Sequence, residues 1–228
     1  MIGSRTHWSG WAQQKHSFDP KSISGLVLWL TGASYSATTG TWTDLSGTGH
    51  HGTQGTAGAR GASTTSAQLG GKATWLPDGI DDYLSFAAIG GAPLTLVAAI
   101  HPITTGGRLL EGTSSGGIII FGSNTQIQLY SNGGPLTATV SAYQNSGFIL
   151  TGVWNVASSV LRKGGVQIAA GNPGGTALGA AWVLGKGTAG GFSNTHVAEL
   201  LAYNRDLNAS GEISAVEKYL GTSYGVAA

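Results

Sequence analysis

The stretch Gly117-Ile-Ile-Ile-Phe-Gly-Ser-Asn-Thr-Gln-Ile-Gln-Leu-Tyr130 contains two strand patterns separated by turn-forming residues. Its first part is continuously apolar, which is typical of a strand covered on both faces or at a subunit contact. Its second part, Gln126–Tyr130, alternates polar and apolar side chains, so one face of that strand should be buried and the other solvated. The stretch therefore predicts two short strands with a turn between them.

Short runs of the same kind recur through the rest of the chain. They are rich in β-branched or aromatic residues, and turn-forming residues bound them. About a dozen such strands are typical of a β-sandwich or a β-barrel. The further strand candidates are residues 25–30, 73–75, 83–86, 94–100, 108–111, 138–143, 148–155, 158–162, 166–169, 181–184 and 196–203.

Only the C-terminal segment has a convincing helical pattern. Ile213, Val216 and Leu220 form an apolar stripe at the spacing that places them on one face of a helix. Asn208 or Ser210 is expected to cap the start of this helix. A glycine is expected to end it in the left-handed conformation. The candidates for that glycine are Gly221 and Gly225.

The composition excludes several classes of protein. Of 228 residues, 39 are Gly and only 9% are charged, against about 25% in an ordinary domain. A hydrophobic share of 41% argues against a disordered chain, and the low charge argues against a coiled coil. The net charge is +1 and the basic residues are scattered, so we expect no nucleic-acid partner. No apolar run is long enough to predict a membrane span.

The chain contains no Cys, which excludes disulfides and fits synthesis in a reducing cytoplasm. Residues 1–17 lack an apolar core, so we expect no signal peptide. Residues 1–20 are polar and aromatic and precede the first strand candidate. We interpret residues 1–20 as an N-terminal anchoring arm and residues 21–228 as one domain.

Candidate catalytic carboxylates are scarce. A glycosidase needs two carboxyl groups across the scissile bond. Glu111 and Glu199 are the only acids within strand candidates, and each stands alone on its strand. Such an acid more often makes a structural hydrogen bond or ion pair. The sequence therefore predicts a protein that is not an enzyme, and a glycan-degrading activity would have to rest on Glu111 or Glu199.

The densest acidic cluster is Asp78-Gly-Ile-Asp-Asp82. Carboxylate oxygens on a loop could hold calcium. The alternative is a turn in which Asp side chains accept hydrogen bonds from backbone amides beside Gly79. An EF-hand spacing is absent, which favours the turn, so no cofactor is predicted.

The aromatic residues divide into two groups. Trp29, Trp75, Trp154 and Trp182 lie in apolar strands and are expected in the core. A second group lies near strand ends or turns, where a sugar ring or a neighbouring subunit could stack on an exposed side chain. The candidates for glycan stacking are Tyr35, Trp42, Tyr130 and Tyr143.

Four segments, in order, resemble LamG-like jelly rolls of the concanavalin A-like lectin/glucanase superfamily. They are residues 25–34, Trp42-Thr-Asp-Leu-Ser-Gly-Thr-Gly-His-His-Gly-Thr53, Leu76-Pro-Asp-Gly-Ile-Asp-Asp-Tyr-Leu84, and residues 199–207 with the helix that follows. The resemblance implies a two-sheet antiparallel jelly-roll sandwich with a short C-terminal helix. It also implies that Asp44 and residues 78–82 form framework turns. Members of the family bind calcium or glycans at the rim of the sandwich.

The opening Phe18-Asp-Pro-Lys-Ser-Ile-Ser-Gly-Leu-Val-Leu-Trp-Leu30 resembles tailed-bacteriophage virion proteins of this kind. The resemblance implies a non-enzymatic virion structural protein, made in the host cytoplasm and located in the virion as a capsid decoration, head fibre or tail-fibre module. We expect the arm to anchor it to capsid or tail proteins, with Trp8 and Trp11 as buried contacts. A homo-oligomer such as a trimer is expected. The alternative is a glycan-binding module for host-surface adsorption.

Overall fold

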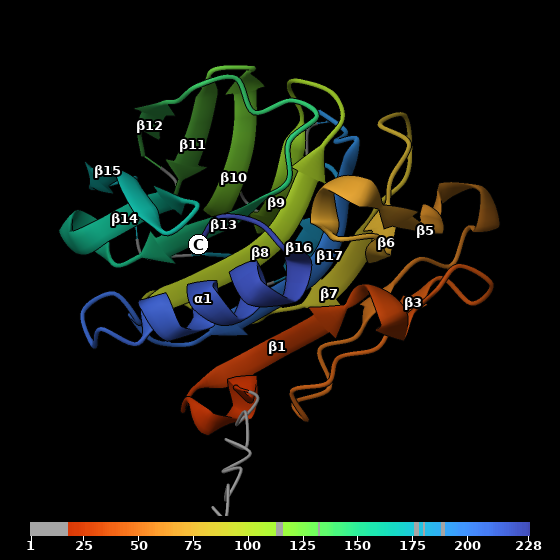
Figure 1. Ribbon diagram of the computed structural model, residues 1–228, viewed down its shortest axis with the longest axis horizontal. Helices are drawn as coiled ribbons and strands as arrows, with labels where there is room; N and C mark the ends of the chain where they lie inside the picture. Colours follow the sequence, from red (N-terminus) through yellow and green to blue (C-terminus); the bar gives the residue numbers. More distant parts are fainter. Residues whose placement is uncertain (1–17, 113–115, 132, 176–177, 180, 188–189) are drawn as a thin grey trace, which may run out of the picture.

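The computed structural model describes residues 18–112, 116–131, 133–175, 178–179, 181–187 and 190–228. They form two antiparallel sheets packed face to face (Figure 1). The first sheet joins β15 (Val166–Gly171), β14 (Ser159–Lys163), β13 (Phe148–Trp154), β8 (Leu94–Pro102), β17 (Thr195–Tyr203), β6 (Lys72–Leu76) and β5 (Ala62–Ser66), with β1 (Leu26–Thr31) also paired to β17.

The second sheet has nine strands. It joins β12 (Leu136–Thr139), β11 (Gln126–Tyr130), β10 (Gly116–Ser123), β9 (Arg108–Gly112), β16 (Ala181–Leu184), β7 (Leu84–Ala87), β4 (Gly52–Thr53), β3 (Thr41–Trp42) and β2 (Tyr35–Ser36). The predicted all-β sandwich of two antiparallel sheets is therefore confirmed.

The main core lies between the two sheets. Alternate residues of β8, including Leu96 and Ala98, face the second sheet and pack against its inward residues. Trp75, Trp154 and Trp182 are at most 1% exposed and belong to this core, as predicted.

The opposite face of the first sheet is covered by α1 (Ile213–Tyr224), which Figure 1 shows lying across β8 and β13. The predicted stripe of Ile213, Val216 and Leu220 is buried there in a second apolar cluster. Gly225 ends the helix with φ 66°, as one of the two candidates. The predicted cap is wrong: the residue before the helix is Glu212, whose side chain makes no capping hydrogen bond.

One buried carboxylate joins the helix to two strands. Glu199 on β17 is 2% exposed. It accepts hydrogen bonds from Trp29 Nε1 on β1 (2.7 Å), from Tyr219 Oη (2.9 Å) and from Tyr224 Oη (2.8 Å) on α1. Burial raises the pKa of Glu199, against the opposing effect of these hydrogen bonds. Trp29 is therefore half-buried beside α1 and not in the core between the sheets, where it was predicted.

Strands β12 and β5 depart from the sequence prediction. The strand expected at residues 138–143 is β12, which ends at Thr139. Beyond it the chain turns, and Tyr143 N donates to Asn124 Oδ1 at 3.1 Å. β5 was not predicted, because Ala-Ser-Thr-Thr-Ser contains no large apolar residue and no alternation.

A pair of histidines lies on the same face of the first sheet as α1. His101 and His196 are direct cross-strand neighbours on β8 and β17. Their rings stack with centroids 5.1 Å apart. His101 Nδ1 lies 2.8 Å from Ser66 Oγ, and His196 Nδ1 lies 2.8 Å from Thr74 Oγ1. Burial, with His101 beside it, lowers the pKa of His196 to about 4.

We predict that removing the Glu199 carboxylate destabilises the fold. Glu199→Ala leaves the buried Tyr224 hydroxyl and the half-buried Trp29 and Tyr219 donors without their acceptor. We expect a cost of about 2–4 kcal/mol in the free energy of unfolding. Urea denaturation measures this change. The control is Glu212→Ala, which removes a partly exposed ion pair with Arg205 and should cost under about 1 kcal/mol. Equal effects of the two substitutions would contradict the role given to Glu199.

We predict that His196 lowers the free energy of unfolding of the protein at acidic pH. Its folded pKa of about 4 lies below its ordinary value of 6.5. The folded state therefore disfavours protonation, so stability is full above pH 6.5 and is lost as the pH falls toward 4. The loss is roughly 2–3 kcal/mol. Urea denaturation at a series of pH values measures this loss, and His196→Asn should flatten the unfolding free energy over this range. A wild-type profile in His196→Asn would refute the assignment.

Candidate functional site

The outer face of the second sheet, directed away from the core, is the candidate binding surface. The α-helix of the described residues lies on the first sheet, so no described α-helix covers this face (Figure 1). An uncovered sheet face is available to a ligand, and the side chains that alternate outward along its strands decide what it can bind.

Five uncharged side chains gather on this face at β11 and β12. Ile127 and Leu129 of β11 are buried, so the intervening residues point outward. On β12, Ala138 is buried and its two neighbours are exposed. Gln128 and Thr137 are paired across the strands, and Gln128 Nε2 donates to Thr137 Oγ1 at 3.2 Å. The outward residues, which we call the β11–β12 face, are Gln126, Gln128, Tyr130, Thr137 and Thr139.

The chemistry of the β11–β12 face suits a hydroxyl-rich ligand. Amide and hydroxyl side chains both donate and accept hydrogen bonds without carrying charge. Tyr130 is half-buried and adds an aromatic ring at the end of the row. The alternation of Gln126–Tyr130 predicted the solvated side of this strand correctly. Thr137 was missed, because the strand was predicted to begin at residue 138, whereas β12 begins at Leu136.

Three of the four predicted stacking residues are not available to a sugar. Tyr35 is 7% exposed, and Trp42 and Tyr143 are fully buried. Stacking needs an exposed ring face, so the prediction is wrong for these three. Burial raises the pKa of the Tyr35 and Tyr143 hydroxyls to about 12. Tyr130 stays a candidate.

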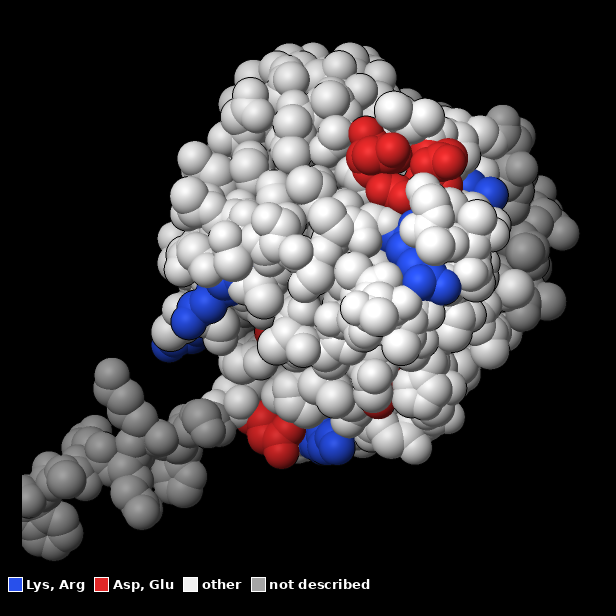
Figure 2. Space-filling view, turned by 90° about the vertical axis from the view of Figure 1, so that its right-hand side faces the viewer, with Lys and Arg blue, Asp and Glu red and all other residues white. Residues whose placement is uncertain are grey.

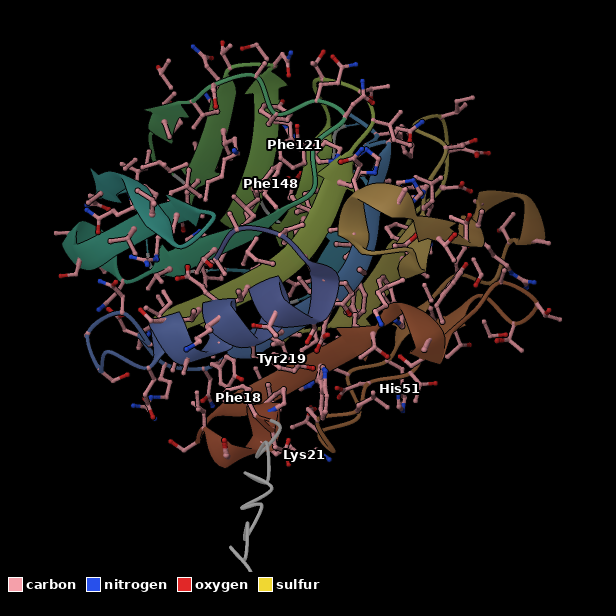
Figure 3. The ribbon with its side chains drawn as sticks, viewed as in Figure 1. Phe18, Lys21, His51, Phe121, Phe148 and Tyr219 are labelled. Carbon is pink, nitrogen blue, oxygen red and sulfur yellow. The ribbon has the colours of Figure 1, made fainter. Side chains whose placement is uncertain are left out.

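The buried aromatics pack against one another between the sheets. Tyr35 and Trp42 lie in edge contact with centroids 5.8 Å apart, and Trp42 Nε1 donates to Thr31 O at 2.6 Å. Tyr143 contacts Phe121 and Phe148, whose centroids lie 5.2 and 6.3 Å from its own. Figure 3 shows Phe121 and Phe148 together in the upper part of the sandwich. These rings all belong to the core between the sheets.

The two strand carboxylates lie on different sheets. Glu111 on β9 is fully buried and forms an ion pair with Arg108. A side chain at Gly187 would place Cβ 2.6 Å from Glu111 Oε2, so glycine is required where the chain crosses this ion pair. Glu199 makes the hydrogen bonds described above. The structural roles predicted for both acids are confirmed, and the two do not face each other across one site.

The acidic turn lies at the rim of the second sheet, before β7. Carboxylate oxygens of Asp78, Asp81 and Asp82 lie within 4.8 Å of one another, and they form the red group in the upper right of Figure 2. Asp78 Oδ1 accepts from Ile80 N at 2.7 Å and from Asp81 N at 3.2 Å. The turn role is therefore confirmed. The same oxygens are of the type that binds a hard cation such as calcium.

The environment of the turn separates the pKa values of its acids. Burial, with Asp78 and Asp81 nearby, raises the pKa of Asp82. For Asp78 the backbone hydrogen bonds outweigh burial and lower the pKa. Close by, the ammonium of Lys186 lies 3.6 Å from the ring centroid of Tyr83. The rim is thus more acidic than the β11–β12 face.

The predicted anchor residues Trp8 and Trp11 lie outside the described residues. The described chain begins at Phe18, which was assigned to the arm. Its ring lies 5.2 Å from that of Tyr219, centroid to centroid, and the two are labelled side by side in Figure 3. Pro20 is buried, and its carbonyl accepts from Tyr203 Oη at 3.2 Å. Residues 18–20 therefore pack against the sandwich.

Among the described residues, no helix combines the length and apolar character that a membrane crossing requires.

The fold is shared with solved proteins of low sequence identity. Trypanosoma rangeli sialidase in complex with sialic acid matches with a TM-score of 0.62 and 16% identity, over 90% of this chain and 34% of the sialidase chain. The binding domain of botulinum neurotoxin DC matches in complex with SialylT (TM-score 0.59, 12% identity, 86% of this chain and 51% of that one). The same domain in complex with rat synaptotagmin II gives a TM-score of 0.61 at 12% identity, over 89% of this chain and 52% of that one.

No family model matches the chain, and no curated protein matches it. The chain spans about a third of the sialidase chains and about half of the neurotoxin chains that it matches. The likeness shows a β-sandwich fold, and the comparisons show no link to phage proteins. The prediction that the protein is not an enzyme is contradicted, because sialidases stand among these matches. At 16–17% identity the likeness assigns no reaction to this chain.

Proposed function

We propose that the protein is a glycan-binding module and that its binding surface is the β11–β12 face. One observation carries the proposal: Tyr130 lies half-exposed in a row of amide and hydroxyl side chains on a sheet face that no described α-helix covers. A sugar presents hydroxyls at its edge and a C–H face above its ring, so it uses both kinds of group.

The shared fold supports this proposal. The matched structures include a sialidase bound to sialic acid and a neurotoxin binding domain bound to SialylT. The same β-sandwich architecture therefore occurs in proteins solved with carbohydrate ligands. A shared fold does not identify the ligand of this chain. The specificity therefore has to come from the residues of the β11–β12 face.

A role in a virion is a second proposal, and it concerns where the module is displayed. In the view of Figures 1 and 3, the described chain begins at Phe18 below β1, whereas β11 and β12 lie at the top. Attachment through the N-terminal arm would leave β11 and β12 at the end of the sandwich that lies away from the particle. This arrangement suits a capsid decoration, head fibre or tail-fibre module that adsorbs to host-surface glycans.

We predict that Tyr130→Ala weakens glycan binding about tenfold or more, because stacking on the ring is lost. Tyr130→Phe keeps the ring and should stay within about threefold of the wild type. Affinities are measured by calorimetry with the strongest ligand from an oligosaccharide array. The control is Val166→Ala on β15, which is 64% exposed on the other sheet and should leave binding unchanged. Full binding by a folded Tyr130→Ala protein would overturn the assignment of this face.

We predict that deleting residues 1–17 abolishes incorporation into phage particles and leaves glycan binding intact, because residues 18–20 already belong to the sandwich. Mass spectrometry of purified particles measures incorporation, and the same calorimetry measures binding. Undiminished incorporation of the truncated chain would refute the anchoring role of the arm.

A further inference from the structure

We infer that the β11–β12 face selects uncharged sugars and discriminates against sialylated and other carboxylate-bearing glycans. The inference rests on the proposed function and names its ligand class. It separates this chain from the matched proteins whose structures were solved in complex with sialic acid or SialylT.

The first support is a charge-free segment of the sequence. Residues 112–161 contain no Asp, Glu, Lys, Arg or His. This segment includes all of β10, β11 and β12, with the turns that join them. Every side chain that these three strands can present to a ligand is therefore uncharged at any physiological pH.

The second support is that the nearest cationic side chain along the second sheet is already held in an ion pair. Arg108 on β9 is one strand beyond β10, and its guanidinium is engaged by the buried carboxylate of Glu111. Recognition of a carboxylate usually depends on a free Arg or Lys that forms charge-assisted hydrogen bonds. Arg108 would have to leave a buried partner uncompensated in order to supply them, which is costly.

The third support is the sign of the charge at the rim. Three carboxylates gather in the acidic turn, and the ammonium of Lys186 lies over the ring of Tyr83, which follows the turn. The rim precedes β7, four strands from β11, which is about 19 Å at the usual strand spacing. That distance exceeds the Debye length at physiological salt, about 8 Å. The rim therefore acts only on a glycan long enough to extend across the sheet, and it repels an acidic one.

Together these features determine the binding free energies of neutral and of acidic sugars on this face. A neutral sugar exchanges hydrogen bonds with water for hydrogen bonds with Gln128, Thr137 and their neighbours, at little net cost. A sialic acid on the same surface partly desolvates its carboxylate without gaining a cationic partner. The face therefore favours neutral hexoses.

The test uses pairs of glycans that differ only by a terminal sialic acid, titrated against the full chain. We expect the neutral member of each pair to bind at least about tenfold more tightly, which corresponds to about 1.4 kcal/mol. Thr137→Lys places a cation beside Gln128 and should raise the affinity for the sialylated member several-fold. Val166→Lys adds the same charge on β15 and should change neither affinity.

The outcomes separate the inference from the proposed function. Equal or tighter binding of the sialylated member by the wild type overturns the inference and leaves glycan binding standing. Binding of neither member overturns both. Analytical ultracentrifugation tests the alternative that a second copy of the chain, and not a glycan, occupies this uncharged face. If the wild type forms an oligomer that Thr137→Lys dissociates and Val166→Lys does not, a second copy of the chain occupies the face, and the inference fails.

Discussion

The arrangement of the molecule depends on the buried carboxylate of Glu199. It accepts hydrogen bonds from an indole on β1 and from two tyrosines on α1. These elements lie at opposite ends of the sequence, so one side chain fixes the first strand and the last helix to the same sheet. An isolated buried charge is unfavourable, and three donors from packed aromatic residues compensate it. The network therefore decides which sheet the helix covers.

A second buried acid holds the same helix in register. Glu217 of α1 accepts from Thr151 Oγ1 on β13 at 2.8 Å and pairs with Arg162 on β14 at 2.8 Å. Glu199 and Glu217 thus attach α1 to four strands of the first sheet. These contacts hold α1 on the first sheet, and no other described α-helix covers the outer face of the second sheet. The proposed binding surface therefore depends both on where the helix is held and on the side chains of β11 and β12.

Local patterns in the sequence predicted those parts of the fold that depend on interactions between residues close together in the chain. The alternation of Gln126–Tyr130 gave a strand with the correct buried face, and the stripe of α1 gave its buried side. The turn at Asp44 also formed as expected, with its carboxylate accepting from the backbone of Trp29 and His50. Burial of Tyr35 could not be predicted, because it depends on contact with Trp75, forty residues away in sequence. The candidate site could not be predicted for the same reason, because only the pairing of β11 with β12 places Gln128 beside Thr137.

The scarcity of charge has a further consequence for association. Although 9% of residues are charged, three of the ten acids, Glu111, Glu199 and Glu217, are at most 2% exposed and act inside the fold. The surface is therefore less charged than the composition suggests, and it offers little long-range attraction to a partner. Electrostatic steering accelerates encounter, whereas short-range contacts set the lifetime of a complex. Recognition on such a face has to come from shape, hydrogen bonds and aromatic contact, and its strength should respond little to salt.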